Sequence, residues 1–410
     1  MHDPVGAEPF QVAVPESMLV DLRERLSRAR FPIEPVAPPW HYGTSLSYMR
    51  EMVAYWRDQY DWRKSEAAIN RFPQYRVPIG GKRVHFILER GSGPDPLPLL
   101  ISHGWPGSIV EFLQVIEPLA HPERFGGDAR DAFTVVAPSL PGYGFSDPPD
   151  APITTRDMAG TFHTLMTQVL GCQRFVAQGG DWGSMITSWL ALDHPENLAA
   201  IHLNMAGLRP AFSSADLAPE EKAWLDAQAT RTARETGYQL IQATKPQTLS
   251  YGLTDSPTGL AAWILEKFHG WTIPGRDAPP PFDRDHLLAN IMLYWLAGPN
   301  AASWLYCSRF DPSVRQVPPN QRVEVPVGVL LMPNDLAVPP PTRWLERSYN
   351  IVHRRDGADG GHFPAFEKPE LFVEELRGFF RKFRGQLPSP NPLPEGEGFS
   401  APSPCGRGLG

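Results

Sequence analysis

The most constraining feature of this sequence is the hexapeptide Gly-Gly-Asp-Trp-Gly-Ser at residues 179–184. Small residues two positions either side of a central side chain are typical of a nucleophile elbow, the sharp turn between a buried strand and a helix. Glycines allow that turn because they have no Cβ atom to clash. The central position usually carries a serine, but here it carries Asp181. A carboxylate attacks carbon electrophiles and leaves an ester, so the hexapeptide disfavours an ordinary serine esterase.

Short apolar runs alternate with helix-like segments through the middle and the C-terminal part of the chain. This alternation predicts the α/β class, a mostly parallel sheet with helices on both faces. Buried strands are expected at residues 97–102, 133–137, 174–178, 199–204 and 325–332. The stretch of about 120 residues between the last two is rich in Ala, Leu and Trp and is too long for a loop. We therefore expect a helical cap inserted into the sheet domain.

Four parts of the chain follow from this pattern. Residues 1–90 are expected to form an N-terminal part, with helices at 15–31 and 45–60 and a hairpin that turns at Gly80-Gly81. The core should comprise residues 91–207 and 320–385, with the cap at 208–319. Residues 386–410 are mostly Pro, Gly, Ser and Glu, which bury too little apolar surface to order, and we expect a disordered tail.

Composition excludes several function classes. The hydrophobic share of 42% and charged share of 20% are those of a soluble globular protein, and a net charge of −7 gives no reason to expect nucleic acid or anionic membrane as a partner. No apolar run reaches the length of a membrane-spanning helix, and no signal peptide is recognisable. Cys172, Cys307 and Cys405 lack metal-ligand spacing and are interpreted as reduced thiols. We expect a cytoplasmic protein without a membrane anchor, and both a monomer and a homodimer stay open.

Two downstream segments supply partners for Asp181. In α/β-hydrolase folds the chain order is nucleophile, acid and histidine. Asp335 follows the expected strand 325–332, and His362 lies further on in Gly-Gly-His-Phe-Pro. The segment between them leaves room for one helix, at about 341–349, and one strand, at about 351–354. Alone, an Asn-Asp pair after a strand is more often turn chemistry, and a histidine in a glycine turn is more often structural. In this order and context the three residues predict a catalytic triad.

A second segment, Ser-His-Gly-Trp-Pro-Gly-Ser at residues 102–108, follows the first core strand. Hydrolysis of an enzyme-bound ester needs backbone N–H donors aimed at the developing oxyanion. In this fold one donor comes from the residue after the nucleophile and one from a loop after an earlier strand. These rules predict an oxyanion hole made by the N–H groups of Trp182 and Trp105. His103 is interpreted as a hydrogen-bonding brace of the loop.

Several separate motifs resemble those of the microsomal-type epoxide hydrolases. They are His-Gly-Trp-Pro-Gly-Ser at 103–108, Pro-Gly-Tyr-Gly-Phe-Ser at 141–146, the hexapeptide at 179–184 and Gly-His-Phe-Pro-Ala-Phe-Glu at 361–367. Residues 60–63 and 70–74 resemble the N-terminal extension of that family, so the resemblance implies that residues 1–90 are an extension that packs on the core. The resemblance covers about residues 9–383 and implies an α/β-hydrolase fold that needs neither a metal nor an organic cofactor. It also implies that Asp181 attacks an epoxide and forms an ester, which water then cleaves to a vicinal diol.

The resemblance implies two cap tyrosines that donate hydrogen bonds to the epoxide oxygen. The segment at 237–246 is similar to the first tyrosine's surroundings and indicates Tyr238. Ser-Trp-Leu-Tyr at 303–306 indicates Tyr306 as the second, although the serine is one residue closer than in the family pattern. Tyr294, in Leu-Tyr-Trp, is a rival.

The predicted function is therefore hydrolysis of a small apolar epoxide with water. Haloalkane dehalogenases also use an aspartate at the elbow, and they are the nearest alternative among enzymes. A non-catalytic ligand-binding relative is the alternative from another class. A serine esterase that uses Ser184 is disfavoured, because Ser184 lies three residues after the elbow apex and inside the expected helix.

Overall fold

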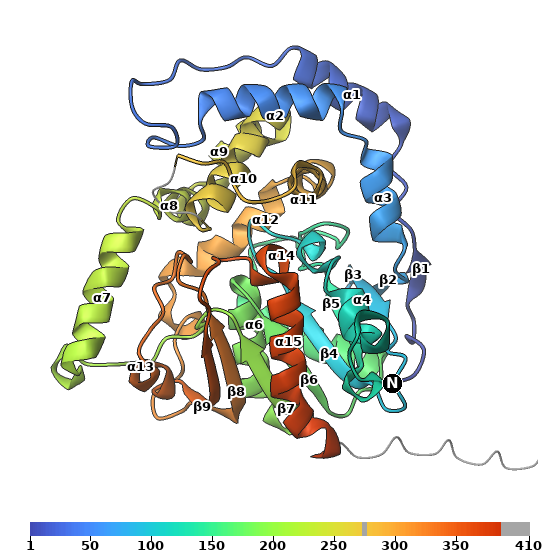
Figure 1. The fold of residues 1–410 in the computed structure, drawn as a ribbon, viewed down its shortest axis with the longest axis vertical. Coiled ribbons are helices and arrows are strands. Elements are labelled where there is room, and N and C mark those ends of the chain that lie inside the picture. Colours follow the sequence, from blue (N-terminus) through green and yellow to red (C-terminus); the bar gives the residue numbers. More distant parts are fainter. Residues whose placement is uncertain (273–276, 387–410) are drawn as a thin grey trace, which may run out of the picture.

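A single mixed sheet forms the centre of the protein. The computed structural model describes residues 1–272 and 277–386, so the expected tail, beyond residue 386, and Cys405 lie outside the described residues. Within those ranges the nine strands follow the order β1-β2-β3-β5-β4-β6-β7-β8-β9 (Figure 1). The strands are β1 Glu8–Phe10, β2 Gln74–Ile79, β3 Lys82–Glu89, β4 Leu97–Ser102, β5 Phe133–Pro138, β6 Phe175–Gly179, β7 Leu198–Leu203, β8 Val323–Leu331 and β9 Tyr349–Asp356.

Helices cover the sheet and form a second layer above one edge of it. Those on and near the sheet are α4 Ile116–Ala120, α5 Thr155–Thr164, α6 Trp182–Asp193, α13 Thr342–Glu346, α14 Pro364–Glu367 and α15 Pro369–Phe380. The segment between β7 and β8 holds α7 Pro219–Thr232, α8 Gly237–Thr244, α9 Pro246–Asp255, α10 Pro257–Gly270, α11 Arg284–Ala297 and α12 Asn300–Trp304. The N-terminal helices are α1 Glu16–Ser27, α2 Leu46–Asp58 and α3 Trp62–Asn70.

The predicted α/β class is confirmed by the pairing of the strands. From β5 through β4, β6, β7 and β8 to β9 every neighbouring pair is parallel, whereas β1, β2, β3 and β5 pair antiparallel. Each of the five expected core strands is present, with its ends shifted by at most two residues. The segment expected as a helical cap is indeed helical, from α7 to α12, and we call these helices the cap.

The first ninety residues contribute to two layers. Strands β1, β2 and β3 extend the core sheet, and the hairpin between β2 and β3 turns at Gly80-Gly81 as expected. Helices α1 and α2 pack against α10 and lie across the cap on the side away from the sheet, whereas α3 packs against α11 at the side of the cap (Figure 1). The division of the chain at residues 90, 208 and 319 stays a prediction.

Two helices are shorter than the apolar pattern indicated. Helix α1 ends at Ser27 instead of residue 31, and Phe31 precedes a proline, a position that disfavours helical backbone. Helix α13 spans only Thr342–Glu346, because Tyr349 already opens strand β9. The buried Tyr349 hydroxyl accepts the backbone N–H of Leu208 at 2.6 Å, which holds that residue in the sheet.

Helix α6 is the most deeply enclosed element near the elbow. Ten consecutive residues, from Trp182 to Ala191, are buried, and the helix packs between α5 and strands β4, β6 and β8. A helix that is apolar on all sides belongs inside the core, where close packing keeps it from shifting. The start of α6 is therefore a rigid platform. Among the described residues, no helix has the length and apolar character needed to cross a membrane.

Candidate active site

The residue at the elbow is held in an unusual backbone conformation. Asp181 links β6 to α6 with φ of 49° and ψ of −126°, a region that costs a non-glycine residue about 1–3 kcal/mol. The turn is tight: a Cβ atom at Gly183 would lie 2.0 Å from the carbonyl oxygen of Ser102. At Gly104 a Cβ atom would lie 2.1 Å from Asp181 Oδ1. The glycines on both sides thus leave room for the strained turn and for the carboxylate.

The three predicted triad residues meet at the carboxyl ends of the parallel strands. Asp181 follows β6, Asp335 follows β8 and His362 follows β9, so the parallel sheet brings all three to one edge. His362 Nδ1 lies 2.7 Å from Asp335 Oδ1, and His362 Nε2 lies 3.2 Å from Asp181 Oδ2. The side chain of Asp181 is 18% exposed, whereas that of His362 is 2% exposed. The carboxylate of Asp181 is therefore the member of the group that an incoming molecule can reach.

The two carboxylates control the charge of His362. Burial by itself lowers the pKa of the imidazole, but Asp335 and Asp181 outweigh that effect and hold the pKa well above its ordinary value. An imidazole between two carboxylates is charged at neutral pH, with one N–H directed at each of them. In this resting state His362 donates hydrogen bonds and is not available as a base.

The loop after β4 contacts the other oxygen of Asp181. The backbone N–H of Trp105 donates to Asp181 Oδ1 at 2.8 Å. Trp182 is the first residue of α6, where backbone N–H groups have no partner within the helix. Helix α11 holds the loop in place, since Asn290 Nδ2 donates to the carbonyl of Pro106 at 2.7 Å and the Tyr294 hydroxyl donates to that of Gly107 at 2.7 Å.

The hydroxyl groups of the cap tyrosines differ in what they bind. The hydroxyl proton of Tyr294 is committed to Gly107, outside the cavity above Asp181. Tyr238 and Tyr306 line that cavity, and their ring centroids are 5.7 Å apart. The Tyr238 hydroxyl accepts a bond from Gln239 Nε2 at 2.9 Å, which leaves its own proton to be donated. Burial raises the pKa of both tyrosines well above the ordinary value, so both stay protonated.

A cavity of about 450 Å³ opens over this group of residues. Asp181, Trp182, Tyr238, Tyr306 and His362 belong to its lining. The volume is within the usual range of about 300–1,000 Å³ for small-molecule sites. The Trp182 ring lies 4.8 Å from that of Tyr306, so aromatic faces surround the exposed carboxylate. The arrangement presents a nucleophile on one wall and two O–H donors from the cap in the same cavity.

The comparisons with known proteins show to which family the chain belongs. Residues 7–112 match the family model described as the epoxide hydrolase N terminus, and residues 98–241 match that of the alpha/beta hydrolase fold. A Stigmatella aurantiaca protein provisionally named an epoxide hydrolase is 43% identical over 93% of this chain and 86% of that protein. Epoxide hydrolase 1 of Sus scrofa is 34% identical over 90% of this chain and 88% of the relative. The chain belongs to the epoxide hydrolase family.

Solved structures of the family extend the agreement to three dimensions. The crystal structure of juvenile hormone epoxide hydrolase from Bombyx mori superimposes on this protein with a TM-score of 0.82 and 31% sequence identity. The superposition covers 94% of this chain and 96% of the Bombyx mori chain. The α/β-hydrolase fold expected from the motifs is thereby confirmed. The prediction that the protein is a hydrolase is confirmed as well, because the matching family model and the relatives are those of epoxide hydrolases.

The sequence analysis did not identify Glu367 as a residue of the active site. Its carboxylate accepts the backbone N–H groups of Gly361 and Phe363, each at 2.9 Å, on the two sides of His362. Burial raises the pKa of Glu367 to about 7, although the two backbone donors act against that shift. Its place at the end of the quoted motif 361–367 was the available signal. Glu111, next to the Trp105 loop, was also missed, and burial raises its pKa to about 8.

Replacing Glu367 by alanine is expected to loosen the turn that carries His362. At pH 8, where the carboxylate is ionised, two backbone N–H groups would lose their acceptor, and the free energy of unfolding should fall by about 2 kcal/mol. Turnover should fall at least about tenfold, because the histidine loses its fixed position. Urea unfolding and steady-state kinetics measure the two effects. Glu367→Gln keeps one acceptor oxygen and should retain part of the stability and part of the turnover. Glu370→Ala, at an exposed position, is the control. Equal stability and activity of all three variants would contradict the role of Glu367 in holding the His362 turn.

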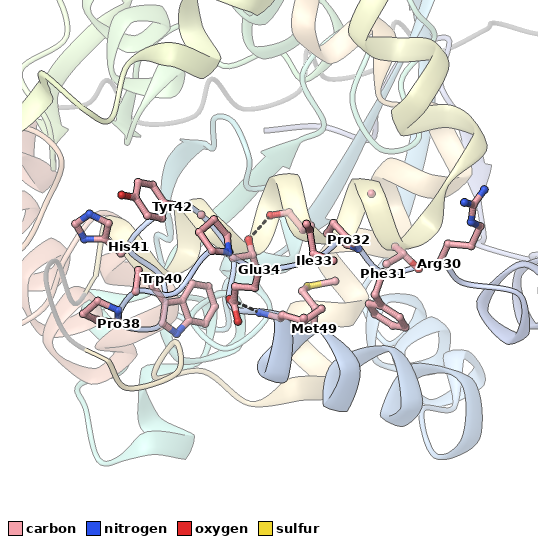
Figure 2. A pocket seen from close by; sticks show the side chains of 18 of the residues that line it. Arg30, Phe31, Pro32, Ile33, Glu34, Pro38, Trp40, His41, Tyr42 and Met49 are labelled. Carbon is pink, nitrogen blue, oxygen red and sulfur yellow. Dashed lines mark hydrogen bonds between the residues drawn. The ribbon is translucent and has the colours of Figure 1, made fainter.

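Two other features lie apart from the triad. A second cavity of about 350 Å³ is lined by the segment from Arg30 to Thr44 and by α2 and α10, and Figure 2 shows Trp40, Tyr42 and Met49 on its walls. It shares no lining residue with the cavity over Asp181. The described part of the chain also holds a group of side chains that could bind a metal ion. It consists of His163 in α5 and of His194 and Glu196 after α6, whose ligand atoms lie within 4.8 Å of one another.

Proposed function

We propose that this protein hydrolyses epoxides to vicinal diols through an ester formed on Asp181. One observation carries the proposal: each oxygen of the Asp181 carboxylate has a separate task. Oδ1 is bound by the N–H of Trp105 at 2.8 Å, while Oδ2 lies 3.2 Å from His362 and faces a cavity that Tyr238 and Tyr306 also line. A nucleophile, an oxyanion donor and acids for the leaving oxygen are the groups that this reaction needs.

In the first half of the reaction, Oδ2 of Asp181 attacks one carbon of the oxirane, and the carbon–oxygen bond on that carbon breaks. The departing alkoxide is far more basic than a phenolate, so the hydroxyl groups of Tyr238 and Tyr306 stabilise it by hydrogen bonding, and one of them supplies its proton. Burial dominates the pKa of Tyr238 in the resting site, but Arg309 lowers that pKa and so favours a negative charge on the hydroxyl. The product is a hydroxyalkyl ester of Asp181.

Formation of the ester also changes His362. The imidazole is held charged by two carboxylates, and esterification removes the charge of one of them. The pKa of His362 then falls toward its ordinary value, so the residue can pass its proton back to the deprotonated tyrosine and act as a base. It takes a proton from water, which attacks the carbonyl carbon of the ester, while the N–H groups of Trp105 and Trp182 stabilise the oxyanion. The oxyanion then collapses, the bond from the carbonyl carbon to the alkyl oxygen breaks, and His362 gives its proton to that oxygen, so that the diol leaves and the Asp181 carboxylate is restored. Asp335 keeps the imidazole oriented throughout.

The two alternative functions make different demands on the cavity. A haloalkane dehalogenase has to stabilise a departing halide, which needs no proton, so two protonated tyrosines in the lining of the cavity favour the epoxide. A ligand-binding relative has no use for a strained elbow with a complete triad behind it, since strain of this kind persists where function requires it. Membership of the epoxide hydrolase family points the same way.

Tyrosine replacement separates the epoxide reaction from the dehalogenase reaction. Tyr306→Phe and Tyr238→Phe should each lower the turnover of an aryl epoxide by about 10²-fold, because each removes one donor to the leaving oxygen. The double variant should lose at least about 10³-fold. Tyr251→Phe, an exposed tyrosine of α9, is the matched control and should retain full activity. Full activity of the double variant, or chloride release from a chloroalkane by the wild type, would favour the dehalogenase instead.

A single-turnover reaction in ¹⁸O-water tests the ester route itself. Enzyme in excess over an aryl epoxide should give a diol without the label, because the diol oxygen comes from Asp181. Mass spectrometry of the peptide that contains Asp181 should then find ¹⁸O in its carboxylate. Label in the diol and none in the peptide would contradict the ester. No diol at all would leave the ligand-binding relative as the better explanation.

The substrate and cellular location follow from the same features. We infer a small epoxide that enters the cavity from water, with water as the second reactant. Cys172 and Cys307 form no disulfide, which supports a reducing, cytoplasmic location.

A further inference from the structure

Three arginines line the cavity above Asp181. Arg209 follows β7, Arg309 lies in the turn Leu305–Phe310, and Arg315 lies before β8. We call these three residues the arginine cluster. Arg309 donates to Gln239 Oε1, and the Arg315 guanidinium lies 5.8 Å from the centre of the Trp182 ring. Arg309 and Arg315 are half-buried and Arg209 is exposed, and among the residues that the structure describes none of the three has a carboxylate as an ion-pair partner.

The arginine cluster is electrostatically unfavourable as it stands. Burial lowers the pKa of Arg315 to about 10, and the neighbouring Arg209 and Arg309 lower it further. Burial and Arg309 also lower the pKa of Arg209. Partly buried charges of one sign that face one another cost free energy unless a counter-charge joins them. An anionic molecule that enters the cavity can supply that counter-charge, because the three guanidinium groups share its lining.

The arginine cluster lies beside the reacting groups. Arg315 stacks over Trp182, the residue that follows Asp181. Arg309 is joined through Gln239 to the hydroxyl of Tyr238, since Gln239 accepts from Arg309 and donates to Tyr238. Apolar side chains line another part of the same cavity, namely Leu225, Trp224, Val338 and Trp344. The cavity thus offers an apolar wall, a nucleophile and an anion site to one small molecule.

We propose that the epoxide taken by this enzyme carries a carboxylate, which the arginine cluster binds while Asp181 attacks the oxirane. This deepens the proposed function and rests on it. Guanidinium groups bind carboxylates through paired N–H donors, and the attraction is strong where water is largely excluded. The prediction of a purely apolar substrate did not include this group of charges. Arg209, Arg309 and Arg315 are far apart from Asp181 in the chain, and none of the recognised motifs contains them.

A matched pair of substrates tests the proposal. The acid is 4-(oxiran-2-yl)benzoate, and its methyl ester has the same oxirane and ring without the charge. The wild type should have a kcat/KM at least tenfold higher for the acid, and this preference should decrease as salt is added. Arg315→Gln should remove tenfold or more of the kcat/KM for the acid, and Arg209→Gln with Arg315→Gln should remove the preference. The kcat/KM for epoxide opening of the methyl ester substrate should change less than twofold in the single and in the double variant. Arg309 is left intact because it holds Gln239 against Tyr238.

The control removes one arginine charge elsewhere. Arg322 pairs with Glu324 at 2.8 Å on an exposed part of the chain, so Arg322→Gln should change neither substrate. Equal losses for acid and ester in Arg315→Gln would overturn the proposal, because the arginines would then act only on the tyrosines and the departing oxygen. Hydrolysis of the ester without preference for the acid would also overturn it and would leave the proposed function standing.

Binding without chemistry separates the two proposals. In isothermal titration calorimetry the wild type should bind 4-ethylbenzoate at least tenfold more tightly than 4-ethylbenzamide, and Arg315→Gln should bind both alike. Failure of both epoxides to react, with the benzoate preference intact, would count against the proposed function alone. Equal binding of benzoate and benzamide would overturn the carboxylate site, whether or not an epoxide is hydrolysed.

Discussion

Asp181→Ala is expected to abolish epoxide turnover, with a fall in kcat of at least about 10⁴-fold. The variant loses the only atom that can form the ester, and the remaining groups would have to direct water at an oxirane from the wrong position. Product formation by chromatography at high enzyme concentration measures the residual rate. The same variant should give no labelled peptide in ¹⁸O-water, since no ester is formed.

The control for this variant is Asp193→Ala at the other end of α6. Asp193 pairs with Arg156 at 2.7 Å and is outside the cavity lining, so its loss should leave turnover unchanged. Thermal unfolding of both variants shows whether the elbow still folds. If folded Asp181→Ala retains more than a tenth of wild-type activity, Asp181 is not the nucleophile and the mechanism is wrong.

His362→Gln is expected to stop the reaction half-way. Attack by Asp181 needs an ionised carboxylate and two protonated tyrosines, so the first half should continue. The second half needs a base 3.2 Å from the reacting carboxylate, which glutamine does not supply. The enzyme should therefore accumulate as the ester, with a protein mass increased by the mass of the epoxide, while steady-state turnover falls by at least about 10³-fold.

Intact-protein mass spectrometry measures this accumulation within minutes of mixing with an aryl epoxide. His286→Gln, a surface histidine of α11, is the matched control and should show neither adduct nor loss of turnover. Asp181→Ala combined with His362→Gln should show no adduct, which would assign the mass to Asp181. Absence of an adduct from folded His362→Gln would mean that the histidine is needed before the ester forms. Unchanged turnover would remove it from the triad.

The positions of the core strands along the chain and the elbow could be expected from local pattern, whereas the order of the strands in the sheet was not predicted. Apolar runs of strand length alternate with helix-like segments, and the elbow glycines mark a turn that other residues cannot make. Helix ends were less predictable, because they depend on tertiary contacts. Helix α13 stops short since Tyr349 is drawn into the sheet by the N–H of Leu208, a residue distant in the chain.

The choice among the cap tyrosines needed the tertiary structure. Tyr238, Tyr294 and Tyr306 are equivalent as residue types, and the motif context left all three open. Only the folded chain shows that the Tyr294 hydroxyl is used by the carbonyl of Gly107, whereas Tyr238 and Tyr306 line the cavity. The roles given to the latter two stay predictions until the variants are measured.

The amino-acid sequence alone shows which class of reaction to consider. The elbow aspartate, and the acid and the histidine that follow later strands, each lie in a short turn that can be recognised from local sequence. Which charged groups surround the substrate next to the nucleophile depends on the tertiary structure. Arg209, Arg309 and Arg315 lie on separate segments around the cap and meet beside Trp182 only when the chain is folded. The three charges are scattered in the sequence, and they come together because packing places all of them in the lining of one cavity. Among the described residues no carboxylate pairs with them, which leaves their N–H groups for a ligand.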